Sequence, residues 1–149
     1  MRLNASMAQV TLRGWNPQKL DALRRAKGWT WARCAARTET PRSTLMGYVY
    51  RTVTPSPAAL ARIADAFGVE TRDLIDIPDD VQLSDLKAYA GLSVAALAQK
   101  VQLSPDYTGV VMRGEAPVAH PQLWASALGV SEADVLAAAA NSRRQLAED

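Results

Sequence analysis

Apolar residues recur every three or four positions through much of the chain, a spacing typical of amphipathic helices. In the stretch 57–68, the apolar residues that would share one helix face are Leu60, Ile63, Ala64 and Phe67. In the stretch 17–27, they are Leu20, Leu23 and Ala26. No run alternates apolar and polar residues as a half-buried strand does, so the pattern predicts an all-α fold.

Residues that begin and end helices divide positions 16–77 into five short helices. Three of these helices have a suitable N-cap residue, namely Asn16, Thr30 and Ser56. Two have a proline suited to the first helical position, Pro17 and Pro57. Glycines suited to a left-handed helix end are Gly28 and Gly68. The third helix is expected from Thr40-Pro41 to about Tyr50. A final short helix is expected from Glu70 or Thr71, with Leu74 and Ile75.

This pattern occurs twice in the chain. GWTWARCAARTETPRSTL followed by PSPAALARIADAFGVETRDLI matches GLSVAALAQKVQLSPDYTG followed by APVAHPQLWASALGVSEADVL. A repeat of about 60 residues is long enough for a small domain. We therefore predict two tandem five-helix domains, at 16–77 and 78–149, after an N-terminal arm at 1–15. The second domain would end in a helix formed by VLAAAANSRRQLAED.

The order of elements resembles the helix-turn-helix domain of phage Cro and lambda-type repressors, the XRE family. The resemblance rests on LDALRRAKGWTWARCAARTETPRSTL and PSPAALARIADAFGV. It implies a domain whose third helix enters the DNA major groove with its N-terminal residues at the base edges. Residues that depart from the usual Gln, Leu, Gly and Glu of the family are Trp31, Cys34, Glu39 and Val49.

The resemblance also implies a DNA-binding site on the second and third helices. The base-reading positions carried over are Arg42, Ser43, Met46 and Gly47. Arginine can fork to guanine, serine bonds several bases, methionine offers an apolar contact such as to a thymine methyl, and glycine permits close approach. The expected phosphate contacts are Thr30, Trp31, Arg33, Arg37, Thr44 and Arg51. For Arg33 and Arg37, which lie four residues apart, the alternative is a solvated stripe.

Several aromatic and apolar residues have two interpretations. Trp29 and Trp31 are two residues apart, so they cannot both face one core. The resemblance implies that Trp29 is the buried one and that Trp31 is more exposed, and we also expect Tyr48 and Cys34 in the core. Tyr50 would be either a core residue or a cover for the DNA backbone. The N-terminal arm, with Arg2 and Arg13, would either wrap DNA or be a disordered tail.

The second copy differs at the helix that would read DNA. The residues at its equivalent positions are Pro105, Asp106, Tyr107, Gly109 and Val110. Because Asp106 would repel phosphates, we predict that this copy has lost most DNA contact and serves dimerisation or partner binding. The expected contact residues are Tyr107 and Val110, together with the C-terminal helix. Val111 and Trp124 are expected in the core and His120 in a surface loop.

Charge divides the chain in the same way. Residues 1–77 hold 12 Lys and Arg against 6 Asp and Glu (12 − 6 = +6), and residues 78–149 hold 5 against 9 (5 − 9 = −4). Ten of those 12 basic residues are arginines, whose planar fork matches phosphate. This asymmetry suits a chain in which only the first half meets a polyanion, although two solvated surfaces would have the same composition.

The composition leaves few other kinds of chemistry. One cysteine cannot form an internal disulfide, and with one histidine it leaves too few N and S ligands for an ordinary zinc site. A catalytic pair of Cys34 and His120 is disfavoured because Cys34 is at a core position. We expect no metal, no cofactor and no enzymatic activity. Apolar runs of signal-peptide or membrane-spanning length are absent, so the expected location is the cytoplasm, at the nucleoid, with no membrane contact.

Three functional hypotheses follow. The leading one is a homodimeric transcriptional regulator, most simply a repressor, that binds double-stranded DNA at a palindromic site. The second is a tandem binder in which both copies of one chain touch DNA. The third is a protein-interaction module, such as an adaptor or phage inhibitor, on a helix-turn-helix scaffold that reads no DNA.

Overall fold

The computed structural model describes residues 12–51 and 53–148. Within these ranges the chain forms nine α-helices and one 3₁₀-helix and no strand, apart from an isolated bridge between Trp15 and Ile75. The all-α fold predicted from the sequence is therefore confirmed. The chain divides into two compact units, Met1–Ile77 (unit 1) and Pro78–Asp149 (unit 2), and each is described by itself.

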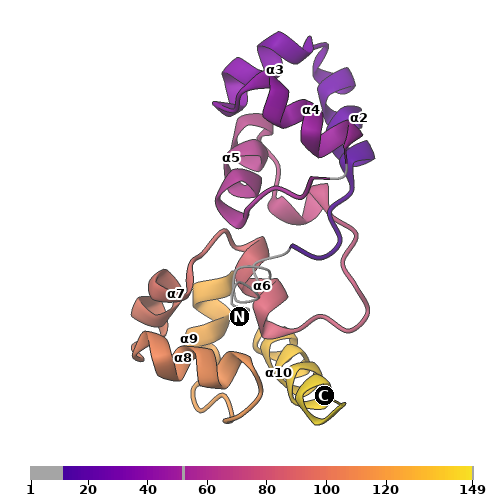
Figure 1. Ribbon diagram of the computed structural model, residues 1–149. Helices are drawn as coiled ribbons and strands as arrows, with labels where there is room; N and C mark the ends of the chain where they lie inside the picture. The colour runs from indigo at the N-terminus through magenta and orange to yellow at the C-terminus, as the bar shows by residue number, and fades with distance from the viewer. Residues whose placement is uncertain (1–11, 52, 149) are drawn as a thin grey trace, which may run out of the picture. The chain divides into compact units, whose positions relative to one another are not determined.

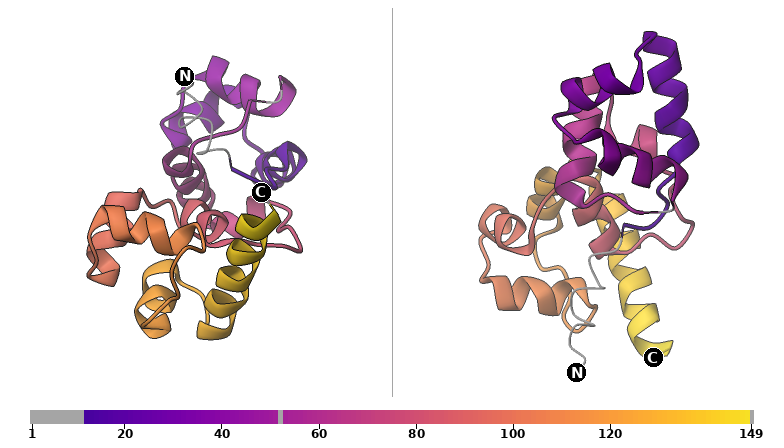
Figure 2. Two further views of the ribbon diagram at one scale, coloured as in Figure 1. Left: turned by 60° about the horizontal axis from the view of Figure 1, so that its bottom comes forward. Right: turned by 45° about the horizontal axis from the view of Figure 1, so that its top comes forward.

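Unit 1 contains α2 (Pro17–Lys27), α3 (Trp31–Thr38), α4 (Arg42–Tyr50), α5 (Pro57–Phe67) and the 3₁₀-helix η1 (Thr71–Leu74) (Figures 1 and 2). The three predicted N-caps are confirmed: the side-chain oxygens of Asn16, Thr30 and Ser56 accept hydrogen bonds from the backbone N–H groups of the first helical turns. Gly28 and Gly68 end α2 and α5 with a φ of 70°. Local cap chemistry thus sets these helix limits.

The core of unit 1 is formed by the inner faces of α2 to α5 and by η1. Its fully buried side chains include Leu20, Cys34, Leu45, Leu60, Ile63 and Leu74. Trp29 is also buried and packs on Phe67 with 4.8 Å between ring centroids. The core positions expected for Trp29, Tyr48 and Cys34 are confirmed. Ala26, expected on the apolar face of α2, is instead exposed near the helix end.

Part of the segment that the sequence assigns to an N-terminal arm, residues 12–15, packs in unit 1. Residues 1–11, including Arg2, lie outside the described part of the chain. Residues 12–15 are part of unit 1, because Leu12 is buried and Trp15 forms the bridge with Ile75. Gly14 O accepts a bond from Asp76 N at 2.7 Å, and Trp15 Nε1 donates to Tyr48 O at 3.1 Å. These bonds tie the segment before α2 to the end of the unit at Asp76 and to α4 at Tyr48.

Unit 2 contains α6 (Leu83–Tyr89), α7 (Val94–Val101), α8 (Pro105–Met112), α9 (Pro121–Leu128) and α10 (Glu132–Glu148). Trp124 and Val111 are buried, and His120 is exposed just before α9, as the sequence predicts. Ser142 of α10 accepts from Leu83 N at 3.1 Å. In the described ranges no single helix is long and apolar enough to span a membrane; only α9 and α10 taken together, across a 101° bend, have the length and composition.

A left-handed residue connects two helices in each unit. In unit 1, α3 ends at Glu39 (φ 53°), and in unit 2, α7 ends at Gln102 (φ 63°). These are the two non-glycine residues with positive φ among those described. Interpretation of unit 2 as a degenerate helix-turn-helix copy stays a prediction.

Candidate functional site

The site is built on α3, the turn after it, and α4. Buried threonine hydroxyls fix the turn, since Thr38 Oγ1 donates to Cys34 O at 2.8 Å and Thr40 Oγ1 donates to Thr38 O at 3.1 Å. The left-handed Glu39 between them reverses the chain, where a glycine would be less strained. Helix α4 then begins at Arg42, with Pro41 before it. The turn therefore sets the direction in which α4 leaves α3.

Helix α4 has one buried and one exposed face. Leu45 and Tyr48 point into the core, and burial raises the pKa of the Tyr48 hydroxyl. Arg42 and Ser43 are exposed on the first turn, and Met46 is half-buried one turn later. The structure thus presents the first-turn residues to solvent, where a groove could receive them.

Gly47 is less accessible than expected from the sequence, which predicts close approach of DNA to this residue. It is buried, and a Cβ added to it would lie 3.2 Å from Arg51 Nη2 and 3.5 Å from Val53 Cγ2. Side chains of the chain itself therefore fill the space beside it. The absence of a side chain at Gly47 leaves room for Arg51 and Val53. This packing disfavours the predicted close approach of DNA to Gly47.

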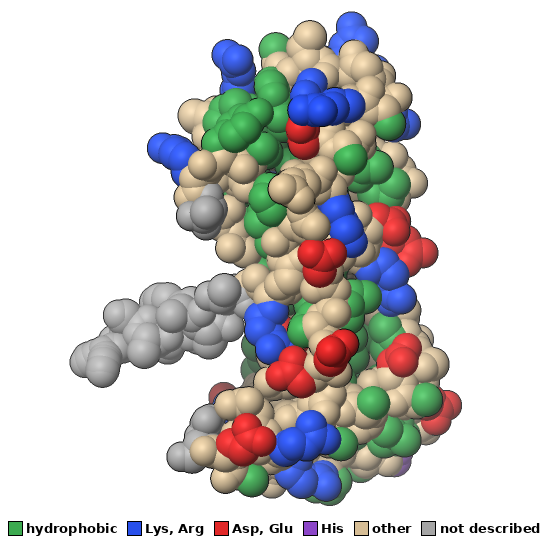
Figure 3. Space-filling view, turned by 90° about the vertical axis from the view of Figure 1, so that its right-hand side faces the viewer, with side chains coloured by type: hydrophobic (Ala, Val, Ile, Leu, Met, Phe, Trp, Pro, Cys, Tyr) green, Lys and Arg blue, Asp and Glu red, His purple; other side chains and the backbone are tan. Residues whose placement is uncertain are grey.

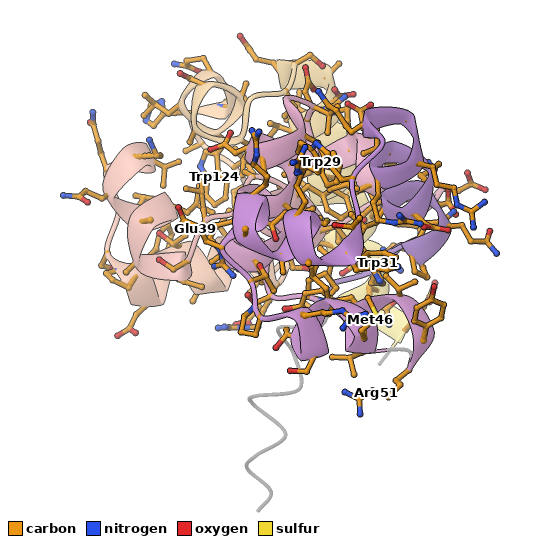
Figure 4. The ribbon with its side chains drawn as sticks, turned by 90° about the horizontal axis from the view of Figure 1, so that it is seen from above. Trp29, Trp31, Glu39, Met46, Arg51 and Trp124 are labelled. Atoms are coloured by element: carbon orange, nitrogen blue, oxygen red, sulfur yellow. The ribbon has the colours of Figure 1, made fainter. Side chains whose placement is uncertain are left out.

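The expected phosphate contacts come from both helices. Thr30, Arg33, Arg37 and Arg51 are exposed, and Trp31 and Thr44 are half-buried. Thr30 Oγ1 is engaged as the cap of α3, and the guanidinium of Arg37 lies over Trp29, 5.4 Å from the ring centroid. In Figure 4, Trp31, Met46 and Arg51 lie on one side of the unit, with Trp29 away from them.

Arg24, Trp31 and Tyr50 form a cluster of contacting side chains beside α4 that the sequence does not predict. The guanidinium of Arg24 lies over the Trp31 ring at 4.3 Å from its centroid, and Tyr50 meets the same ring edge-on at 6.4 Å and 70°. Tyr50 is 66% exposed, so its core alternative is wrong. Arg24 lies near the end of α2 and Trp31 begins α3, so a loop separates them and the periodicity of neither helix predicts that they meet. A sequence signal for this contact is therefore absent.

The surroundings of the site are basic. Residues 30–54 contain four arginines and one glutamate, Glu39. Cys34 is buried on the inner face of α3, and burial raises the pKa of its thiol. Within the described ranges, no three His, Cys, Asp or Glu side chains are grouped to hold a metal ion.

The residues expected at a partner surface in unit 2 are partly accessible. Tyr107 and Asp106 are exposed on the first turn of α8, and Val110 is half-buried. Their role in dimerisation stays a prediction.

Comparison with known proteins bears on unit 1. Residues 19–80 match the family model of the Cro/C1-type HTH DNA-binding domain. The match begins inside α2 and includes α3, α4, α5 and η1. No curated protein and no solved structure matches the chain. Residues 19–80, which include α3, the turn and α4, are therefore similar to the Cro/C1-type HTH DNA-binding domain.

Proposed function

We propose that this protein is a sequence-specific transcriptional regulator that represses by occupying DNA at a promoter. Helix α4 enters the major groove, and Arg42 forks to a guanine at its edge. The N-terminus of α3, capped by Thr30, faces a phosphate, where the helix dipole favours negative charge. Arg33 and Arg51 add sequence-independent phosphate contacts.

The observation that carries this proposal is the exposure of the first turn of α4 within a matched DNA-binding domain. Arg42 and Ser43 are exposed there, although the same helix buries Leu45 and Tyr48. The arginine-rich composition of residues 30–54 supplies the positive charge that a duplex attracts. The tandem binder is less favoured, because α8 presents Asp106 where α4 presents arginine and serine.

The proposal includes a homodimer, since one recognition helix reads too few bases for useful specificity. The outer face of α10 is a suitable contact surface for a second copy. Opposite the buried Val135, Ala138 and Ser142, this face exposes Ala133, Leu136, Ala137 and Ala140.

Substitution of Arg42 tests the proposal. Arg42→Ala should weaken binding to a duplex selected by the native protein by roughly 1–3 kcal/mol and relax the preference at one base position. Arg72→Ala is the control. It removes the same charge as Arg42→Ala, but Arg72 lies on η1, outside the α3–α4 pair. Its effect on affinity should be about twofold or less at 0.15 M salt. Unchanged affinity and base preference in Arg42→Ala would leave the protein-interaction hypothesis favoured.

A further inference from the structure

The outer face of α4 becomes apolar beyond its first turn. Arg42, Met46 and Tyr50 are spaced four residues apart and therefore follow one another along the helix. Tyr50 is 66% exposed, and Val53, just past the helix, is 46% exposed. Met46, Tyr50 and Val53 form what we call the apolar strip. It continues the face on which Arg42 lies.

The apolar strip is held in place by contacts within unit 1. Tyr50 lies against the edge of Trp31, which is itself covered by the Arg24 guanidinium. Val53 N donates to Gly47 O at 3.2 Å, and the Val53 side chain lies beside Gly47, which brings the residue back against α4. Because these side chains are ordered before binding, little conformational freedom is lost when a ligand covers them.

The charge around the apolar strip points to its ligand. Four arginines and one glutamate occur in residues 30–54. Figure 3 shows one face of the protein, on which lysine and arginine side chains lie near apolar ones. A ligand that combines phosphates with apolar groups fits this surface. In the major groove the thymine C5-methyl is such a group, and unmodified cytosine lacks it.

We propose that the apolar strip reads thymine methyl groups at base pairs within a few steps of the one that Arg42 contacts. The proposal rests on the DNA-binding function above and adds Tyr50 and Val53 as specificity-determining residues. Four helical residues advance about 6 Å, so Met46 reaches about two base-pair steps from Arg42. The predicted half-site therefore has thymines within a few steps of a guanine.

Deoxyuridine substitution tests this directly, since it removes only the methyl group. The probe is a duplex that the native full-length chain enriches from a random pool, with each half-site thymine replaced in turn. At one or more thymines near the base whose preference Arg42→Ala relaxes, the native protein should bind about three- to tenfold more weakly. Thymines elsewhere in the duplex serve as internal controls.

Protein variants show which side chain meets the methyl. In Met46→Ala or Tyr50→Ala, deoxyuridine at the responsive thymine should no longer weaken binding, because the variant already lacks the side chain that contacts the methyl group. Ile77→Ala is the matched control: Ile77 is an exposed apolar residue of unit 1 outside α3 and α4, and its variant should keep the full loss. Circular dichroism confirms that each variant is folded.

The failures are distinguishable. If the native protein enriches no duplex, the proposed function falls and this inference falls with it. If it binds a duplex that is sensitive to Arg42→Ala but indifferent to deoxyuridine at every thymine, only the inference is wrong. An equal deoxyuridine loss in native, Met46→Ala and Tyr50→Ala proteins also overturns it.

Discussion

The Arg24 guanidinium lies over the Trp31 indole, with Cζ 4.3 Å from the ring centroid. The same group pairs with Asp21 at 2.9 Å and donates Nη1 to Trp29 O at 2.8 Å. Arg24 thus pairs with Asp21 within α2, bonds to the loop at Trp29, and contacts the first residue of α3 through the Trp31 ring. Its side chain is largely buried, so solvent screens these contacts only weakly.

Loss of Arg24 should therefore destabilise unit 1. Arg24→Ala is expected to lower the free energy of unfolding by about 1–3 kcal/mol, because the Trp29 carbonyl and Asp21 lose a partly buried partner. Arg25→Ala is the matched control, since Arg25 pairs with the same Asp21 but is mostly exposed; its effect should stay below about 1 kcal/mol. Urea unfolding followed by circular dichroism measures both. Equal midpoints for the two variants would contradict this account.

Gly14 should tolerate no side chain. It has φ +91°, and an added Cβ would lie 2.2 Å from Asp76 O, a backbone atom that cannot move cheaply. Gly14→Ala should lower the free energy of unfolding by about 2–4 kcal/mol. Gly28→Ala separates backbone strain from steric crowding, because Gly28 has φ +70° but open space around it. It should lower the free energy of unfolding by about 1 kcal/mol. Thermal unfolding of both variants gives the comparison, and a Gly14 variant as stable as the Gly28 variant would refute it.

Asp76 should make stability depend on pH. The hydrogen bond from Lys19, aided by that from Asn16, lowers the pKa of this carboxyl from its ordinary value of 3.8. A lowered folded-state pKa gives stability that is present above the unfolded pKa and is lost as pH falls through the folded one. The difference in urea midpoint between native protein and Asp76→Asn should be present at pH 7 and shrink below about pH 4.

Leu136 should support self-association if α10 is the dimer surface. It is 51% exposed on the outer face of α10, so Leu136→Glu places a charge there without disturbing the buried Val135 and Ala138. Sedimentation equilibrium should show a dimer for the native chain and a shift toward monomer for the variant. Val94→Glu, on exposed α7, is the control. If Leu136→Glu stays fully dimeric, the contact lies elsewhere.

The helix limits of unit 1 could be predicted because their causes are local. Asn16, Thr30 and Ser56 bond backbone groups two or three residues away, and Gly28 and Gly68 adopt the left-handed conformation that ends their own helices. The exposure of Arg42 likewise follows from its place on the first turn of α4. Such interactions leave a signal in a short stretch of sequence.

Contacts that depend on how the chain folds outside its helices left no such signal. The pairing of Trp15 with Ile75, 60 residues apart in the sequence, brings the segment before α2 against the end of unit 1. The burial of Gly47 depends on Arg51 and Val53 folding back over α4. The contact of Arg24 with Trp31 depends on the path of the loop between their helices. These packing details decide which of the expected site residues are open to a ligand.

Selection of bound sequences from a random duplex pool, followed by titration of the enriched duplex at several salt concentrations, tests the central claim most directly. The account predicts one palindromic motif, with half-sites about one DNA turn apart and an affinity that falls steeply with salt. Two unlike half-sites bound by a single chain would instead support tandem binding. No enriched motif, with only weak binding to any duplex, would contradict sequence-specific regulation by this protein.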